Sequence, residues 1–283
     1  MDRSSAGALK RLWGVVLSLI LTLSLFSCHR TQTPREIPFE AGNIKTIGII
    51  GGVSWVSSLE YYRKMNEMVN EQLGGLHSAQ ILLYSIEFGE FSKQERLAHL
   101  GNWEPLKKTI LDAGRRLESG GADFVVVASN TINSMVPDLK KELNIPVLHI
   151  ADAVGAEIKG KGLKKIALLG TAFTMEQTFY KEILEQGYGL EVVVPQEKER
   201  HYINEVIFNE LCADKFLESS KQEFIRIIRR MVEEEEIQGV ILGCTEIPLL
   251  VHPEDLDIPA FDSTHIHAKA AVNYALKDLK KES

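Results

Sequence analysis

Two polar segments follow apolar runs in this sequence, and both contain side chains that can exchange a proton. The segment SNT (129–131) follows the run FVVVA (124–128), and the segment CTE (244–246) follows the run GVILG (239–243). An apolar run that stops at polar residues is typical of a buried strand whose end reaches the mouth of a sheet. The sequence therefore predicts two polar strand ends, one with a serine and one with a cysteine.

Proton transfer is the chemistry that Cys244 and Ser129 predict if the two strand ends face each other. Inversion of a carbon centre needs a proton removed from one face and another supplied to the opposite face. A free cysteine has a pKa of about 8.5, and backbone amides at a helix start, which Pro248 would permit, lower it further. We expect Thr245 to offer a hydroxyl and a backbone amide to a substrate carboxylate. Glu246 either orients the thiol or caps the helix start.

Ser129 is the weaker partner of this pair. A serine hydroxyl has a far higher pKa than a thiol, so it is a poor general base without help, and the nearby Asn133 is not a base. The hydroxyl remains able to donate a proton or to hold a water that does.

Alternating short strands and helical segments must position these residues. The pattern of repeated βα units predicts parallel sheets with helices on both faces. Three segments of the first half recur in register in the second half: KTIGIIGG (45–52) as KKIALLGT (164–171), FVVVASNTIN (124–133) as GVILGCTEIP (239–248), and NIPVLHI (144–150) as DIPAFD (257–262). This repetition predicts an internal duplication, although any two βα domains share some likeness.

A duplicated α/β chain has a geometric consequence for the site. Ligands in open α/β sheets bind beyond the carboxyl ends of the strands. Two such halves facing each other would place Ser129 and Cys244 on opposite walls of one cleft. We expect a first domain over 44–152, completed by a C-terminal helix at 265–281, and a second domain over 153–264.

Several long motifs resemble the aspartate/glutamate racemase family, in its broad-specificity amino-acid racemase branch. They are GIIGGVSW (48–55), LLGTAFTMEQTFY (168–180), GVILGCTEIPLL (239–250) and FDSTHIHAKAA (261–271). The likeness runs from about Lys45 to Ala275. It implies two pseudo-symmetric Rossmann-like domains with the active site between them, and racemisation of aspartate, glutamate or a related amino acid by a cysteine pair without pyridoxal phosphate. It also implies a homodimer.

The resemblance assigns roles to individual residues. Cys244 matches the second catalytic cysteine, and Ser129 stands at the position of the first. The substrate-binding positions that it implies are Gly52, Ser54, Asn130, Thr131 and Thr245.

Two departures from the family pattern bear on the activity. Asn133 stands where the motif commonly has a histidine, and Ala172 stands where relatives often carry Arg or Lys as a clamp for a side-chain carboxylate. A charge-assisted hydrogen bond is worth roughly 1.5–3 kcal/mol, so the loss of this charge weakens the expectation of an acidic substrate. With Ser129, these departures leave three hypotheses: a racemase that works well from one face and slowly from the other; a one-cysteine isomerase or decarboxylase of dicarboxylic acids; or an envelope amino-acid-binding lipoprotein without turnover.

The remaining composition narrows the class of partner. The 283 residues carry a net charge of -7 without a basic stripe, which argues against a nucleic-acid surface and favours a small-molecule partner. The segment GIIGG lacks the spacing of a dinucleotide loop, so we expect no cofactor. His265 and His267 near Asp262 are too few for a metal site, and we expect no metal.

The N-terminal segment predicts export. Three basic residues precede an uncharged run at 12–27, which is shorter than the about 20 apolar residues of a membrane span. It ends at LFSC (25–28), which resembles a bacterial lipobox with lipidation at Cys28; an uncleaved signal anchor is the alternative. We expect a signal segment over 1–28, a tether over 29–43 and a lipid-anchored protein of the bacterial cell envelope.

Two further cysteines remain after Cys28. Cys212 lies in an amphipathic pattern and is expected to be a buried apolar residue. A Cys212–Cys244 disulfide is conceivable in an oxidising envelope.

Overall fold

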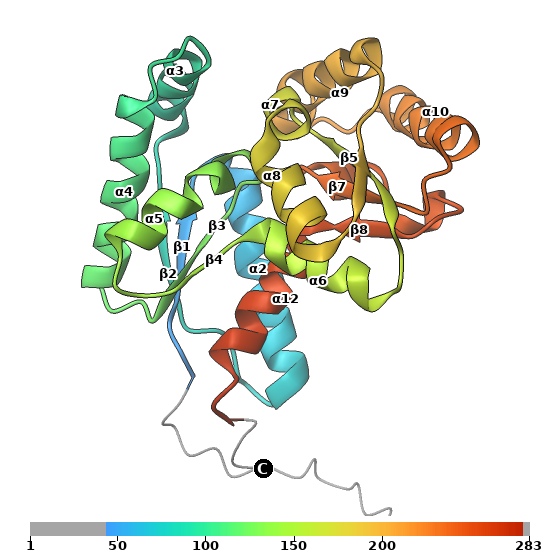
Figure 1. The fold of residues 1–283 in the computed structure, drawn as a ribbon. Coiled ribbons are helices and arrows are strands. Elements are labelled where there is room, and N and C mark those ends of the chain that lie inside the picture. Colours follow the sequence, from blue (N-terminus) through green and yellow to red (C-terminus); the bar gives the residue numbers. More distant parts are fainter. Residues whose placement is uncertain (1–43, 280–283) are drawn as a thin grey trace, which may run out of the picture. The chain divides into compact units, whose positions relative to one another are not determined.

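Two four-stranded parallel sheets organise the computed structural model, which describes residues 44–279 (Figure 1). The strand order is β2-β1-β3-β4 in the first sheet and β6-β5-β7-β8 in the second, so the second repeats the topology of the first. The strands of the first sheet are β1 (Ile47–Gly51), β2 (Ile81–Ser85), β3 (Phe124–Val127) and β4 (Val147–Leu148). Those of the second sheet are β5 (Lys165–Gly170), β6 (Glu191–Val193), β7 (Gly239–Gly243) and β8 (Ala260–Asp262).

Helices connect the strands of each half. Those between β1 and β5 are α2 (Trp55–Leu73), α3 (Phe88–His99), α4 (Glu104–Ser119), the 3₁₀ turn η1 (Thr131–Met135), α5 (Val136–Glu142) and α6 (Ile150–Gly160). Those after β5 are α7 (Ala172–Glu176), α8 (Thr178–Glu182), the π turn η2 (Ile183–Gly187), α9 (Glu197–Asn209), the 3₁₀ turn η3 (Leu211–Ala213), α10 (Glu218–Glu235), α11 (Ile247–Leu250), the 3₁₀ turn η4 (Pro253–Asp255) and α12 (Ser263–Ala275).

The central strands are apolar because helices cover both faces of each sheet. Every residue of β1, β3 and β7 is buried, as expected for parallel strands that are covered on both sides. In the first sheet, α4 and α5 pack on one face and α2 packs on the other. In the second sheet, α9 and α10 cover one face, and α6 and α8 cover the other. The sequence prediction of two pseudo-symmetric α/β halves is confirmed.

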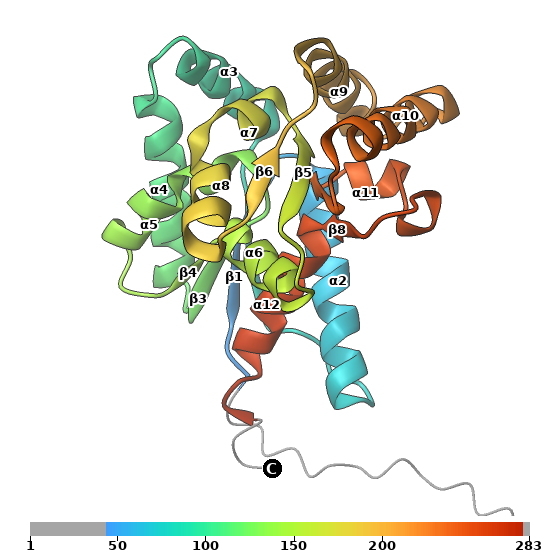
Figure 2. The same ribbon diagram turned by 45° about the vertical axis from the view of Figure 1, so that its right-hand side comes forward.

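The last helix of each half packs against the sheet of the other half. The helix α6 follows β4 of the first sheet, yet its Ile150, Val154 and Ile158 belong to the apolar cluster of the second sheet. The helix α12 follows β8 of the second sheet, yet its Ala268 and Val272 pack with β1 and α2. Both views show α12 beside α2 (Figure 2). This exchange ties the two sheets together and holds their strand ends in a fixed relation.

Two other sequence expectations concern the N-terminal part. The signal segment, the tether and the lipidation site at Cys28 lie outside the described residues. Among the residues that the structure does describe, no helix has the length and the apolar character needed to span a membrane.

Candidate active site

A pocket lies where segments from both sheets meet, at the carboxyl ends of β1, β3, β5 and β7. It contains about 440 Å³ of space, counted out to the solvent at its mouth. This is the position at which open α/β sheets bind ligands. The described residues that line it are Val53, Ser54, Phe88, Glu95, Ser129, Asn130, Thr131, Thr171, Ile207, Phe208, Cys212, Gly243, Cys244, Thr245 and Glu246.

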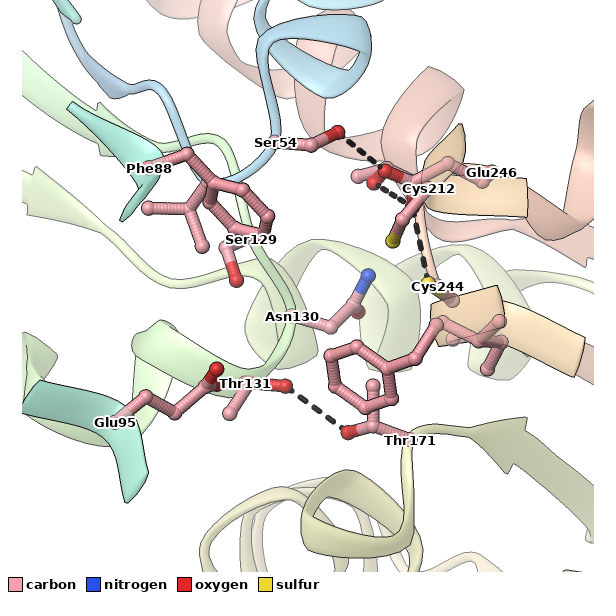
Figure 3. Close-up of a pocket in the computed structure, with 15 residues that line it drawn as sticks. Ser54, Phe88, Glu95, Ser129, Asn130, Thr131, Thr171, Cys212, Cys244 and Glu246 are labelled. Carbon is pink, nitrogen blue, oxygen red and sulfur yellow. Dashed lines mark hydrogen bonds between the residues drawn. The ribbon is translucent and has the colours of Figure 1, made fainter. Parts of the chain in front are cut away.

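Glu246 is the centre of a buried hydrogen-bond network on the β7 side of this pocket (Figure 3). The Cys244 thiol donates to Glu246 Oε2 at 3.0 Å, and the Thr245 hydroxyl donates to the same oxygen at 2.6 Å. Ser54, from the loop after β1, donates to Glu246 Oε1 at 2.7 Å. All four residues are less than a tenth exposed. The carboxylate therefore accepts hydrogen bonds from both halves of the molecule. Of the two roles expected for Glu246, these contacts describe orientation of the thiol.

The Cys244 thiol has a pKa well above its ordinary value, which corrects the expectation of a lowered one. Burial is the main cause, and the adjacent negative charge of Glu246 adds to it. The backbone N–H of Glu246 works in the opposite direction but does not outweigh them. The helix that was expected to help, α11, has only four residues and begins at Ile247. In the free protein Cys244 is therefore a thiol whose proton points at a carboxylate.

Ser129 lies across the pocket from Cys244, at the end of β3 (Figure 3). Its side chain is 7% exposed, and its hydroxyl oxygen accepts a weak hydrogen bond of 3.4 Å from the Ile132 N–H. No base among the described residues contacts the hydroxyl. Asn133 does not help, because it donates to the carbonyls of Val127 and Ser129 and accepts from the Ile150 N–H. Asn133 fixes the strand end and the start of α6 instead.

Asn130 lines the pocket, and its side chain contains an unpaired acceptor. Its Nδ2 donates to Ser263 Oγ at 3.1 Å, and Ser263 Oγ donates in turn to the Leu242 carbonyl at 2.8 Å. This relay fixes the orientation of the amide, since Ser263 has a lone pair and not a proton left for Asn130. The amide oxygen Oδ1 is buried without a hydrogen-bond partner among the described residues. Such an atom is costly to leave unpaired, and an ammonium group of a bound ligand would satisfy it.

Thr131 connects the two halves at the floor of the pocket. Its hydroxyl lies 3.0 Å from the hydroxyl of Thr171 and 3.3 Å from that of Thr174, both from the segment after β5. The backbone N–H groups of Asn130, Thr131 and Thr245 have no acceptor within the described part of the chain. These free donors at the strand ends can receive a carboxylate.

Gly52 is not among the residues that line this pocket, and its expected place in the substrate site stays a prediction. Its φ of +86° and its contact with the chain after β2 explain the glycine: a Cβ there would lie 2.1 Å from the Ile86 carbonyl oxygen. Its N–H donates to Ser58 Oγ at 2.7 Å. Gly52 shapes the loop that delivers Ser54, which does line the pocket.

Eight of the fifteen lining residues were missed by the sequence reasoning, and three of them, Phe88, Glu95 and Cys212, carry aromatic, acidic or thiol side chains. Phe88 and Glu95 come from α3, a helix that was not predicted. Cys212 was expected to be an apolar residue of a helix, but it lies in the turn η3 and lines the pocket. Cys212 and Cys244 are both free thiols. The spacing of Phe88 and Phe91, directly after a strand, is one local signal for α3.

His267 lies outside the pocket, in the interior of the first half. Its Nδ1 accepts from the Tyr61 hydroxyl at 2.9 Å, and its Nε2 donates to the Leu148 carbonyl at 3.3 Å. Burial lowers its pKa to about 3, so it is neutral at physiological pH. No group of three or more metal-ligating side chains occurs among residues 44–279.

Comparison with known proteins identifies the class. A Yersinia pestis protein assigned to the Asp/Glu racemases shares 44% identity and superposes with a TM-score of 0.75, covering 82% of this chain and 99% of that one. An aspartate racemase homologue from Pyrococcus horikoshii shares 39% identity with a TM-score of 0.72 over the same shares. The broad specificity amino-acid racemase RacX of Bacillus subtilis is 25% identical over 232 residues, 80% of this chain and 96% of the relative.

The fold, the pocket and these relatives define a two-lobed amino-acid racemase, an enzyme of the isomerase class. The model of the Asp/Glu/hydantoin racemase family matches residues 50–271, and the chain belongs to this family.

Proposed function

We propose that this enzyme inverts the α-carbon of a free amino acid by cofactor-independent proton transfer, with Cys244 and Ser129 acting on opposite faces. The observation that carries the proposal is the hydrogen bond from the Cys244 thiol to Glu246 Oε2. It gives the thiol a place to leave its proton inside a buried site. Ser129 lines the opposite side of the same pocket.

The first step generates the base. Glu246 accepts the thiol proton, and the resulting thiolate removes the α-proton from the face of the substrate that lies against it. The thiol is then restored, and the electron pair moves from the C–H bond into the substrate carboxylate, as an enediolate. The raised pKa of Cys244 makes its thiolate a stronger base once formed, which suits abstraction of a weakly acidic α-proton.

The second step returns a proton to the other face. The Ser129 hydroxyl, or a water that it holds, donates to Cα. The alkoxide or hydroxide formed recovers a proton from solvent, and Glu246 releases to solvent the proton that it took from the thiol. The free N–H groups of Asn130, Thr131 and Thr245 stabilise the charge on the carboxylate during both steps. Asn130 Oδ1 accepts from the α-ammonium group and fixes the orientation of Cα.

The difference between the two acids predicts an unequal pattern of isotope exchange. Two enantiomers have equal free energy, so kcat/KM for net racemisation is the same in both directions. The enantiomer whose α-proton faces Cys244 can nevertheless lose and regain that proton at the thiol without inversion. We expect one enantiomer to exchange its α-proton with deuterated water faster than it racemises, and the other to exchange only as it inverts.

The test follows α-proton exchange and optical rotation for L- and D-amino acids in deuterated water, with Cys244→Ala alongside. Cys244→Ala should lose exchange with both enantiomers and retain ligand binding measured by calorimetry. Cys212→Ala shows whether the other thiol of the pocket does the work instead, and we expect it to exchange protons. If the wild type binds amino acids but exchanges no α-proton, the protein is a binding lipoprotein. Consumption of a dicarboxylic acid without racemisation would identify a one-cysteine isomerase or decarboxylase.

We also propose that the protein is anchored to the bacterial envelope through a lipid on Cys28. The proposal rests on the apolar run and the LFSC segment. Expression of the full chain and of Cys28→Ala, followed by membrane fractionation and mass spectrometry of the N-terminal peptide, tests it. A wild-type protein without a lipid adduct would overturn it.

We propose a homodimer as the working form. A stripe of exposed apolar residues on α2, made of Trp55, Leu59 and Tyr62, supports this, because each is more than half exposed and contiguous apolar surface marks association sites. Light scattering of the wild type against Leu59→Glu measures the mass directly. A monomeric wild type would exclude the dimer.

A further inference from the structure

The pocket is acidic, and this bears on the side chain of the substrate. Its titratable lining residues are two carboxylates, Glu95 and Glu246, and two thiols, and the lining contains no Lys, Arg or His within residues 44–279. A dicarboxylic amino acid would bring a second negative charge into this surrounding without any side-chain cation to meet it. Ala172, at the position where a clamping cation was expected, donates its backbone N–H to Asn204 Oδ1 and does not line the pocket.

The two carboxylates differ in how they are engaged. Glu246 accepts three hydrogen bonds from Ser54, Cys244 and Thr245. Glu95 accepts no hydrogen bond and makes no ion pair among the described residues, although it is only partly exposed. Figure 3 shows its carboxylate pointing into the pocket near Thr131. Burial raises the pKa of Glu95, and a cation placed beside it would offset that cost.

The walls next to Glu95 suit an aliphatic chain. Phe88 precedes Glu95 on α3, and Ile207 and Phe208 line the pocket from α9. A lysine or ornithine side chain has an apolar stem and a cationic tip, so the stem can pack on apolar walls while the tip reaches a polar partner. The Asn130 Oδ1 acceptor supplies a separate position for the α-ammonium group.

We propose that Glu95 selects amino acids with a cationic side chain, of the lysine and ornithine type, for the racemisation inferred above. The proposal rests on that proposed function, since it assigns the side-chain end of the same substrate. In this assignment the α-ammonium lies at Asn130, the α-carboxylate lies at the free backbone donors of the strand ends, and the side-chain ammonium pairs with Glu95.

The test compares kcat/KM for α-proton exchange on L-lysine, on L-norleucine and on L-glutamate. Norleucine has the stem of lysine without its charge, so the ratio of lysine to norleucine isolates the contribution of the cation. We expect this ratio to be large in the wild type and to fall about 10- to 100-fold in Glu95→Gln, which is the size of one charge-assisted hydrogen bond. Because the ratio is taken within one preparation, partial unfolding of the variant cancels.

Glu90→Gln is the matched control. Glu90 lies on the same helix, is exposed and pairs with Lys93 outside the pocket, so its loss should leave the ratio unchanged. Glu95→Lys should reverse the preference toward glutamate. A wild-type ratio near one, or a ratio that survives Glu95→Gln, would overturn the role of Glu95 while norleucine exchange still upholds the racemase. Absence of exchange with every amino acid would instead overturn the proposed function.

Discussion

The ends of β3 and β7 occupy equivalent positions in the two sheets, yet they carry different chemistry. Cys244 has a carboxylate partner at hydrogen-bond distance, whereas the Ser129 hydroxyl contacts only a backbone N–H. Glu246 also contacts Ser54, so the thiol side depends on a residue from the other half. The duplicated scaffold supplies two facing positions, and the neighbours of each position decide whether it can act as a base.

The largest effect is expected when Cys244 is replaced by serine, so that both strand ends carry a serine. Cys244→Ser should lower α-proton exchange about 10³- to 10⁴-fold for both enantiomers, because a positioned acid–base group contributes up to about 10⁴ in rate and a serine hydroxyl is a far weaker acid than a thiol. Proton nuclear magnetic resonance of the α-proton in deuterated water measures the loss. Retained exchange of either enantiomer in Cys244→Ser would show that the ends of β3 and β7 do not differ in acid–base chemistry.

Removal of the carboxylate partner should have the next largest effect. Glu246→Gln keeps a hydrogen-bonding side chain but cannot take the thiol proton, and we expect about 10²-fold slower exchange at pH 7. Because Glu246 takes the thiol proton within the site, we expect the wild-type rate to change little between pH 7 and 9, although burial and Glu246 raise the pKa of Cys244.

The pH profile separates this role from a structural one. In Glu246→Gln, solvent hydroxide must deprotonate the thiol directly, and the loss of a neighbouring negative charge lowers the thiol pKa. The deficit should therefore narrow as the pH rises from 7 to 9. A deficit that is constant over this range would point to misplacement of Cys244 and not to lost proton transfer.

Replacement of Ser129, the poorer acid–base group of the two, by cysteine should increase racemase activity. Ser129→Cys introduces a more acidic group at the second face, and we expect net racemisation to rise roughly 10-fold, within the range of one acid–base group. Exchange without inversion should fall toward the racemisation rate for the enantiomer that faces Cys244. An unchanged ratio of exchange to racemisation would mean that Ser129 does not limit reprotonation.

The sequence predicted the strand ends because apolar runs and their polar terminators are local features. It predicted the two halves because three segments recur in register. It could not show that α6 and α12 exchange sheets, since which sheet a helix covers depends on its packing and not on its own periodicity.

The site residues on α3 were missed for a different reason. Its first turn is capped by Glu87, which accepts from the N–H groups of Gly89 and Glu90, whereas helix starts are usually recognised by Ser, Thr, Asp or Asn. Gly89 further weakens the helical pattern. The raised pKa of Cys244 also escaped prediction, because burial and the place of Glu246 are properties of the folded chain.

The interiors of the two halves offer a second comparison, away from the pocket. Tyr61 and Tyr180 both follow the last glycine of a first strand by ten positions, and both are fully buried. The Tyr61 hydroxyl donates to His267 on α12. His267 lies eight residues after Pro259. Val154 of α6 lies eight residues after the equivalent proline, Pro146, and packs in the same apolar cluster as Tyr180. The Tyr180 hydroxyl has no partner among the described residues.

This difference predicts opposite responses to the same small substitution. Tyr61→Phe leaves His267 Nδ1 buried and unpaired, so the free energy of unfolding should fall by about 1–3 kcal/mol. Tyr180→Phe removes a hydroxyl that has lost its water without gaining a partner, so stability should be unchanged or slightly higher. Urea unfolding compares the stability of the two variants at pH 7.5. This pH is well above the His267 pKa of about 3, so the histidine is neutral in both variants. An equal fall in the free energy of unfolding of the two variants would mean that the Tyr180 hydroxyl does have a hydrogen-bond partner. The two halves would then differ only at their strand ends.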